Sequence, residues 1–471
     1  MLSDLLKITQ GALNRYRFLM LILITLPLFF ALEPVALILC LLFLCFLSLK
    51  NATVAVFNLY LSIVLSLFFW LYLALVSFAG IYVSESYWPL VKAFLVLPVF
   101  FSILKLMNFK FNFKVTGIKT LAMFLIIILF SLAKGLVIDP FVSIAYLGNV
   151  YAPIVLQFFL IAMVTKLALD NSHLRKHDYQ SSKAFTILIC LILVANSTFL
   201  IFDLLGVVQL KDIFLSVGES LGRGGSEGNT RTHLFGVLFQ RFPGLFADPI
   251  LAAYTLFLFF TYAFCFVSNM HIKMFLLLLS FFLGFVTLSK AFFFLLICFF
   301  SFYFVCKLKV RLKVKFSLAL IVLFFSVALI VIRALFTVVT DSSAVHVQGL
   351  ILPFVSPSSI FAFFIGNDLA TGGNMGGWTL QGAESFVGLL MYNTGLFGVL
   401  LFFWGFFKLM YKLLESKANS SYFLFCFYMS IVSASFLQEN SFNLGFSLVR
   451  IALLVFIILF FTRLKGGYEK A

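Results

Sequence analysis

Long apolar runs recur along the whole chain and are separated by short polar segments. Runs such as 144–165, 184–205 and 385–407 are each long enough to cross a bilayer core of about 30 Å as a helix. Of the 471 residues, 63% are hydrophobic and only 11% are charged, which is too little charge for a water-soluble domain of this size. We therefore predict an all-α integral membrane protein of about fourteen transmembrane helices in one multi-pass domain, residues 1–471. The spans are expected at residues 16–32, 35–49, 54–79, 87–104, 118–133, 144–165, 184–205, 250–268, 274–288, 291–306, 316–336, 385–407, 422–437 and 444–461.

Two connections between these spans are much longer than the others, residues 206–249 and 337–384. The predicted topology puts both on the outer face, and a bundle with otherwise brief loops is expected to build its site from them. Within the second, residues 350–366 are apolar but contain Pro353 and Pro357. The prolines predict an interfacial or re-entrant segment there and not a further span.

The net charge of +16 agrees with this topology. With both termini cytoplasmic, most of the 33 Lys and Arg residues and few of the 17 Asp and Glu residues fall on the inner side. The basic clusters at 110–114, 171–178 and 307–315 all lie there. The basicity is therefore mostly a topology signal, and nucleic acid is not expected as a partner. The seven cysteines lie in or beside apolar runs, and no CxxC or HExxH spacing indicates a metal site.

Some basic residues remain on the outer side, against the topology rule: Lys92, Lys134, Lys211, Arg223, Arg231, Arg241, Lys290, Arg333 and Arg450. Snorkelling of a long side chain to the headgroups is sufficient to explain Lys134 and Lys211. Arg450 is expected a turn or two from the outer boundary. Lys290 interrupts an apolar stretch, 274–306, that would be roughly 50 Å long as one helix, so we predict a break at residues 289–290. Several cations at one leaflet boundary favour a lipid phosphate as ligand, and a polyprenyl diphosphate has the required geometry.

Three elements in the second half of the chain resemble the O-antigen polymerase and ligase superfamily. RFPGLFADPILAAYTLFLFF (241–260) is similar to its Arg-x-x-Gly-x-Phe-x-x-Pro element, and TLSKAFFFLLICFF (287–300) to its Ser-Arg/Lys element. GNDLATGGNMGGWTLQGAESFVGLLMYNTGLFGVLLFF (366–403) resembles its Gly-rich loop, followed by a helix that continues to a Gly-x-x-Gly pair, here Gly395 and Gly398. The order of the elements also fits, whereas the N-terminal helices match only in being apolar.

The resemblance implies a GT-C-like membrane glycosyltransferase of the bacterial inner membrane that needs no metal or cofactor. In O-antigen, lipopolysaccharide and exopolysaccharide biosynthesis, a Wzy-type polymerase transfers a growing glycan from undecaprenyl diphosphate onto a lipid-linked repeat unit at the periplasmic face. A ligase of the same superfamily transfers the glycan to lipid A-core and usually has His where this chain has Glu384, so Glu384 favours polymerase. The implied partners are membrane lipids, the undecaprenyl-diphosphate-linked oligosaccharide, a flippase and a chain-length regulator.

A transporter or flippase of lipid-linked oligosaccharide is the alternative from another class of protein. It predicts inverted repeats, discontinuous helices and ionisable residues near the middle of the bilayer. The sequence has no internal repeat, and its ionisable residues are expected at the outer edge. The sequence therefore favours the enzyme.

The proposed reaction needs cations to stabilise the departing diphosphate. We expect Arg241 on the diphosphate, with Lys290 and Arg333 beside it and Arg231 or Arg450 in support. This role requires that the five side chains converge on one common basin, a shared binding site for the diphosphate.

The reaction also needs a base that takes the proton of the acceptor hydroxyl. Glu384 is our first candidate, ahead of Asp248 and Glu439. Each acid also has a structural explanation: Glu384 and Asp248 as capping residues at helix starts, and Glu439 as an ion-pair partner of Arg450.

Overall fold

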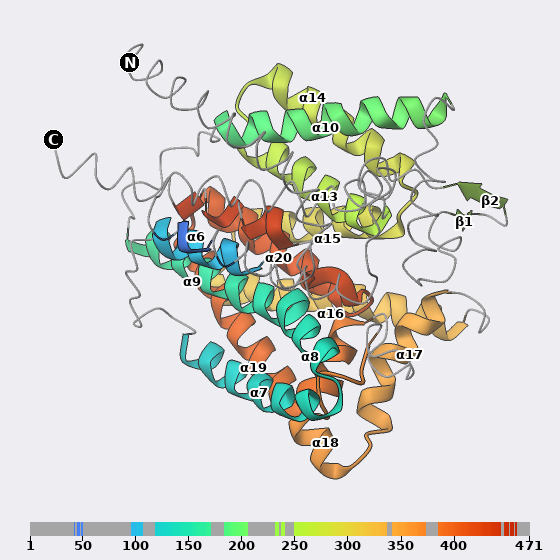
Figure 1. Ribbon diagram of the computed structural model, residues 1–471. Helices are drawn as coiled ribbons and strands as arrows, with labels where there is room; N and C mark the ends of the chain where they lie inside the picture. The colour runs from blue at the N-terminus through green and yellow to red at the C-terminus, as the bar shows by residue number, and fades with distance from the viewer. Residues whose placement is uncertain are drawn as a thin grey trace.

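The computed structural model describes residues 42, 45–47, 49, 96–106, 118–170, 183–205, 231–234, 237–240, 249–336, 342–373, 385–443, 447–451, 453–455, 457 and 458. At some of these positions the backbone alone is described. The helices are α6 Val96–Leu106, α7 Ile118–Ile138, α8 Pro140–Tyr146, the π-helix η2 Leu147–Tyr151, α9 Ala152–Asp170, α10 Lys183–Leu204, α13 Pro249–Phe266, α14 Met270–Val286, α15 Lys290–Lys307, α16 Leu312–Phe336, α17 Ser342–Val355, α18 Ile360–Ile365, α19 Phe386–Ser416, α20 Asn419–Ser435 and the 3₁₀-helix η5 Glu439–Phe442 (Figure 1). A last helical segment holds residues 447–451, 453–455, 457 and 458.

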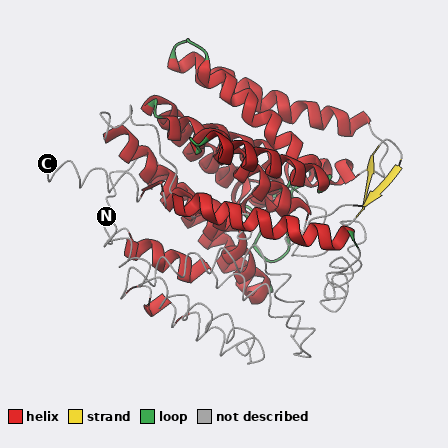
Figure 2. Cartoon of the chain, turned by 90° about the horizontal axis from the view of Figure 1, so that it is seen from above, coloured by secondary structure: helices red, strands yellow, loops and turns green. Residues whose placement is uncertain are grey.

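Within the described residues, six helical stretches are long and apolar enough to cross a membrane: Lys119–Ile138, Pro140–Leu169, Pro249–Phe266, Lys290–Lys307, Leu312–Leu329 and Phe386–Ser416. The prediction of a helical membrane protein is confirmed to that extent. The expected spans at 16–32 and 54–79 lie outside the described residues. A short antiparallel pair, β1 Arg231–Leu234 and β2 Val237–Gln240, was not predicted, and it lies beyond one end of the helices (Figure 2).

The turns α13–α14, α15–α16 and α19–α20 lie at one end of the bundle. Helix α14 packs antiparallel on α13 after a turn of three residues. Phe316, near the start of α16, packs on Tyr411, near the end of α19, with ring centroids 5.4 Å apart. Lys315 lies over Tyr422 in the first turn of α20, 5.8 Å from its ring centroid. We call this the basic end, because its turns and flanking helix ends carry Lys273, Lys307, Lys309, Arg311, Lys313, Lys315, Lys412 and Lys417. We call the end of the bundle that lies away from these turns the opposite end.

The predicted break before Lys290 is confirmed. Helix α14 ends at Val286 and α15 begins at Lys290, with Leu288 in the left-handed region at φ 47°. The two helices cross closely, because a Cβ added to Gly284 would overlap the ring of Phe292. A small residue thus lets α14 and α15 approach each other as a tight hairpin.

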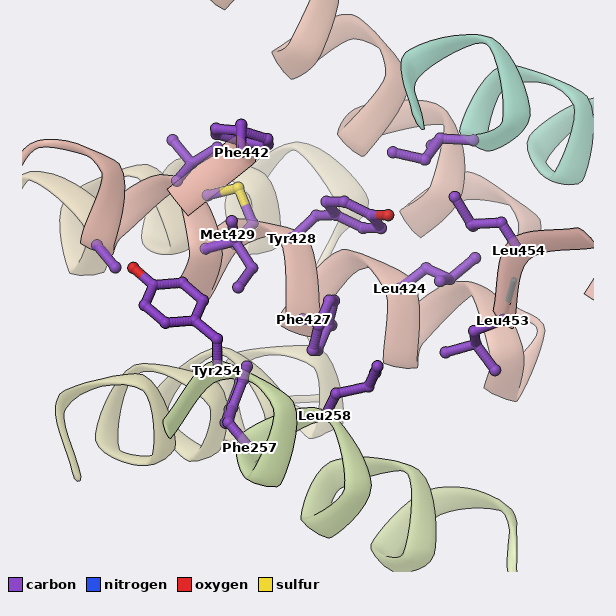
Figure 3. Packing of buried hydrophobic residues seen from close by; sticks show 14 of the residues in the cluster. Tyr254, Phe257, Leu258, Leu424, Phe427, Tyr428, Met429, Phe442, Leu453 and Leu454 are labelled. Carbon is purple, nitrogen blue, oxygen red and sulfur yellow. The ribbon is translucent and has the colours of Figure 1, made fainter. Parts of the chain in front are cut away.

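Helices α13, α15 and α20 form an aromatic core. Phe257 of α13 stacks on Phe427 of α20, with centroids 5.2 Å apart and an angle of 11° between the planes (Figure 3). It also meets Phe299 of α15 edge-on at 6.0 Å. Offset and edge-on ring pairs add to the stabilisation from burial. This packing holds α20, every residue of which from Phe423 to Ser435 is buried, in the centre of the bundle.

Helix α19 consists of two segments joined by a break at Gly395, whose φ of 66° and ψ of −174° are not helical. The rings of Phe386 and Phe402 lie 5.5 Å apart, whereas a straight helix would separate these residues by about 24 Å. The first segment, residues 386–394, therefore folds back along the second, residues 396–416. The first segment runs up to the Gly-x-x-Gly pair, as the resemblance implies, whereas the span expected at 385–407 is not one continuous helix, because Gly395 breaks it.

The segment with the two prolines forms α17 and α18, which are both too short to span a membrane. Pro353 lies inside α17, and the chain leaves the helix only at Ser356, before Pro357. Helix α17 packs on the first segment of α19, where the backbone of Gly349 lies against Gly388. The prediction that residues 350–366 do not form a span is therefore confirmed, although Pro353 does not break the helix.

Candidate functional site

Arg450 is buried in the interior of the helix bundle, with 3% of its surface exposed. Its Nη2 donates hydrogen bonds to the backbone oxygen of Ser441, at 2.6 Å, and to Oγ of Ser447, at 3.3 Å. The guanidinium carbon lies 5.8 Å from the ring centroid of Phe442, within the range of a cation–π contact. A permanently charged group thus lies among apolar helices.

Further polar side chains from three helices continue this set of contacts. The hydroxyls of Tyr254 in α13 and Ser441 in η5 are 2.8 Å apart. Gln157 in α9 donates to Oγ of Ser447 at 2.9 Å and accepts from the hydroxyl of Tyr428 in α20 at 3.2 Å. We call Arg450 and these five residues the Arg450 cluster. Tyr254 lies beside Met429 of α20 and near Phe442 (Figure 3).

The Arg450 cluster lies well inside the bundle. Gln157 is near the middle of the apolar stretch Pro140–Leu169, and Tyr428 is near the middle of α20. Both side chains are almost completely buried, and so are Ser441 and Ser447. Arg450 reaches this cluster through Ser441 and Ser447, because η5 packs against α19 and α20.

Only two of the five predicted cations are described with their side chains, Lys290 and Arg450. Lys290 is the first residue of α15 and is exposed, and no contact between described residues joins it to Arg450. The backbone of Arg231 lies in β1 and that of Arg333 in α16, whereas Arg241 lies outside the described residues. A common basin for these cations therefore stays a prediction.

Of the three candidate bases, Glu439 begins η5 with its backbone alone described, and Glu384 and Asp248 lie outside the described residues. The residue after Glu384 is informative, because Ser385 itself is the N-cap of α19. Its Oγ accepts from the backbone N–H of Gly388 at 3.1 Å and donates to the backbone oxygen of Phe436 at 2.8 Å. Ser385 thus occupies the N-cap position that the structural explanation gave to Glu384.

The start of α19 lies beside the Arg450 cluster. Phe386 packs on Phe442 with ring centroids 4.9 Å apart, and Phe442 is the ring that Arg450 faces. Ser385, next to Phe386, is also fully buried, so α19 begins inside the protein. The sequence contained no signal for this proximity, which depends on the fold-back at Gly395.

A second group of polar contacts surrounds the break in α19. Ser131 of α7 donates to the backbone oxygen of Asn393 at 2.6 Å, and Nδ2 of Asn393 donates to the hydroxyl of Tyr151 at 2.8 Å. Tyr151 ends the π-helix η2, and π-helical turns occur frequently at functional sites. Among the described residues, Oδ1 of Asn393 has no hydrogen-bond partner although the residue is fully buried.

The place of Lys134 of α7 was not predicted from the sequence. Its Nζ donates to the backbone oxygen of Gly366 at 2.7 Å and lies 4.8 Å from the ring centroid of Phe130. Snorkelling towards headgroups is therefore not what Lys134 does. Its partner is 232 positions away along the chain, so no local pattern could have indicated the contact.

The described residues contain no group of three or more His, Cys, Asp or Glu side chains that could hold a metal ion. Fold and site together describe a helical membrane protein with a buried arginine cluster beside a broken helix. Comparison of the chain with family models, with curated proteins and with solved structures gave no match.

Proposed function

We propose that the protein is a membrane glycosyltransferase that acts on glycans linked to a polyprenyl diphosphate. The observation that carries the proposal is Arg450, a guanidinium buried among Tyr, Gln and Ser side chains in an apolar bundle. Ionisable side chains inside membrane proteins are costly and mark functional sites. A planar guanidinium suits a phosphate oxygen, so a lipid diphosphate is a fitting ligand.

Two further observations support a polymerase in particular. The three elements at 241–260, 287–300 and 366–403 resemble the O-antigen polymerase and ligase superfamily, and the third has Glu384 where ligases usually have His. Ser385, and not Glu384, occupies the N-cap position of α19. We therefore assign the chain to polysaccharide polymerisation at the periplasmic face of a bacterial inner membrane, with a GT-C-like fold and no metal.

In the proposed reaction, the acceptor hydroxyl oxygen attacks the anomeric carbon of the glycan on the donor lipid. Glu384, with Asp248 and Glu439 as alternatives, takes the hydroxyl proton as the new carbon–oxygen bond forms. The bond from the anomeric carbon to the diphosphate breaks, and its electron pair stays on the departing diphosphate. The cations proposed to stabilise that charge are Arg241, Lys290, Arg333, Arg231 and Arg450.

A transporter of lipid-linked oligosaccharide is the second candidate, and two structural observations favour it. Helix α19 is discontinuous at Gly395, and Arg450 lies well inside the bundle. Broken helices and deep ionisable residues are typical of secondary transporters. The described helices provide no support for the inverted repeats that such a transporter would also need.

Reconstitution of the purified protein with undecaprenyl-diphosphate oligosaccharide distinguishes the two candidates. A polymerase produces longer lipid-linked glycans, in proteoliposomes and in detergent alike. A transporter moves the substrate to the other leaflet of the proteoliposome and leaves its length unchanged. Transport without elongation would contradict the enzyme.

Arg450→Gln tests the observation that carries the proposal. We expect elongation to fall by at least about a hundredfold, because a charged donor to the leaving group is lost. Arg450→Lys, which keeps the charge without the planar fork, is expected to retain part of the activity. Arg241→Ala and Glu384→Gln are expected to stop elongation as well, and the exposed Lys119→Met is the control. Full activity of Arg450→Gln in a well-folded sample would contradict the role of Arg450.

A further inference from the structure

The hydroxyl of Ser447 is the point at which the hydrogen bonds of the Arg450 cluster meet. It donates its proton to the backbone oxygen of Phe442 at 2.7 Å. It accepts from Nε2 of Gln157 at 2.9 Å and from Nη2 of Arg450 at 3.3 Å. Because a hydroxyl has one proton and two lone pairs, these three contacts use it completely. Gln157 and Arg450 therefore take one lone pair each of the same oxygen.

The side-chain amide of Gln157 is fixed in one orientation. Besides Ser447, its Nε2 donates to the backbone oxygen of Pro153 at 3.2 Å, and its Oε1 accepts from the hydroxyl of Tyr428 at 3.2 Å. The oxygen of Pro153 can only accept, so a flipped amide would bring two acceptors together there. Gln157 is fully buried. It thus presents a donor to Ser447 in a single direction from α9.

The guanidinium of Arg450 is held through both hydrogens of one nitrogen. Nη2 donates to the backbone oxygen of Ser441 at 2.6 Å and to the hydroxyl of Ser447 at 3.3 Å. Since the guanidinium is planar, two acceptors at one nitrogen fix the plane of the whole group. The first acceptor is part of the backbone of η5, whereas the second is the hydroxyl that Gln157 also binds.

We infer that Gln157 is a positioning residue that acts on Arg450 through Ser447, an inference that rests on the proposed function. By occupying one lone pair of the Ser447 hydroxyl, Gln157 leaves the other to Arg450 and so sets the plane of the guanidinium. A guanidinium binds two phosphate oxygens when they lie in its plane. Its orientation therefore decides how well Arg450 stabilises the charge that develops on the departing diphosphate of the donor lipid.

The first test measures the link between Gln157 and Ser447 without any substrate. Melting temperatures of the full chain in detergent are compared for wild type, Gln157→Met, Ser447→Ala and the double variant. Both single changes remove the same hydrogen bond, so we expect the double variant to lose less than the sum of the two single losses. Additive losses would overturn the link, whatever the protein's activity.

Thr165→Val is the matched control for this comparison. Thr165 is another buried polar residue of α9, and its hydroxyl donates to the backbone oxygen of Ile161 in the same helix at 2.7 Å. Its loss of melting temperature is expected to add to that of Ser447→Ala, since the two residues share no hydrogen bond in the structure. Coupling of the same size for Thr165→Val would show a general loss of packing and would also overturn the link.

The second test asks whether the link positions the chemistry. We expect kcat for elongation to fall about ten- to a hundredfold in Gln157→Met with little change in KM, since a small misplacement of a reacting group lowers the rate of the chemical step. In an Arg450→Lys background the same change is expected to cost at most about twofold, because an ammonium has no plane to be set. A merely structural role of Gln157 would give the same fold loss in both backgrounds.

Tyr428→Phe is the second variant, which keeps the ring and removes only the hydroxyl that aligns the amide of Gln157. We expect a smaller fall in kcat than in Gln157→Met, and again almost none in the Arg450→Lys background. Equal fold losses in the two backgrounds, or a normal kcat in Gln157→Met, would overturn the positioning role. A wild type without elongation would instead refute the proposed function, and the melting temperatures would still decide whether Gln157 and Ser447 are linked.

Discussion

At the scale of single residues, two glycines decide how the opposite end of the bundle is built. Gly366 and Gly395 both have positive φ, at 85° and 66°, and their backbones touch. Only a residue without Cβ tolerates such a conformation together with so close an approach. The sequence showed a Gly-x-x-Gly pair there, but the residue that Gly395 actually faces is 29 positions earlier in the chain.

Gly395→Ala is expected to destabilise the protein by about 1–3 kcal/mol or more, because alanine is strained at this φ and ψ and its Cβ would overlap the chain at Phe364 and Gly366. Gly405→Ala is the matched control in the same helix, where the nearest atom to an added Cβ is Cγ2 of Thr120 at 3.3 Å. We expect a change within about 1 kcal/mol for the control, since alanine also favours the helix. Thermal unfolding in detergent measures both variants. Equal melting temperatures for Gly395→Ala and wild type would contradict the break.

At the scale of elements, the helix ends differ in how their first N–H groups are satisfied. Asn269 caps α14, and its Oδ1 accepts from the backbone N–H groups of His271 at 3.0 Å and Ile272 at 3.2 Å. Ser289 occupies the same position before α15 but makes no capping hydrogen bond with its side chain. Sequence alone ranks Asn and Ser as nearly equal caps, so it could not distinguish these two helix starts.

We expect Asn269→Ala to lower the free energy of unfolding by about 1 kcal/mol, because two N–H groups at a helix start lose their acceptor. Ser289→Ala should change it by much less than this value. Chemical unfolding in the same detergent, followed by circular dichroism, gives the comparison. A larger loss for Ser289→Ala than for Asn269→Ala would contradict the assignment of Asn269, and not Ser289, as a side-chain cap.

At the scale of the whole molecule, the basic end and the opposite end of the bundle differ in charge. The turn between α15 and α16 carries Lys309 and Arg311, whereas the turn between α7 and α8 carries Asp139. Helix α7 runs antiparallel to the second segment of α19, since Thr120 lies at Gly405 and Ser131 at Asn393. The two turns are therefore at opposite ends, and the positive-inside rule predicts that the basic one faces the cytoplasm.

Single cysteines introduced at these turns test that orientation. A membrane-impermeant maleimide applied to intact cells should label Ile138→Cys and not Lys309→Cys, and inverted vesicles should show the reverse. Both positions are exposed, whereas the described native cysteines are buried or half-buried and should give a low background. Labelling of Lys309→Cys in intact cells would reverse the assigned sides of the membrane.

The helices were largely predictable, because apolar length is a local property of the chain. The expected spans at 184–205, 250–268 and 422–437 lie within three residues of α10, α13 and α20 at both ends. Helix α19 is an instructive exception, since it runs to Ser416, nine residues past its predicted end. Its last turns are amphipathic and carry Lys412 and Glu415, 2.5 Å apart, so the helix continues after the purely apolar pattern stops.

The site was much less predictable, because its contacts join residues that are far apart in sequence. Arg450 was predicted as a supporting cation, but its place among Gln157, Tyr254 and Tyr428 follows from the packing of three other helices. Lys134 was interpreted as a snorkelling side chain, and its carbonyl partner became visible only in the fold.

By itself, the sequence determined that this chain forms apolar helices, where most of the described ones begin and end to within a few residues, and which of their turns carry the positive charge. These properties depend on residues within a few turns of one another and on the free energy of burying apolar surface. Only the tertiary structure decided that α19 folds back at Gly395, that Ser385 caps it, and that the N-terminal end of α19 lies beside Arg450. The physical reason is that a hydrogen bond or a backbone contact between distant residues is set by how whole helices pack, which no local pattern records.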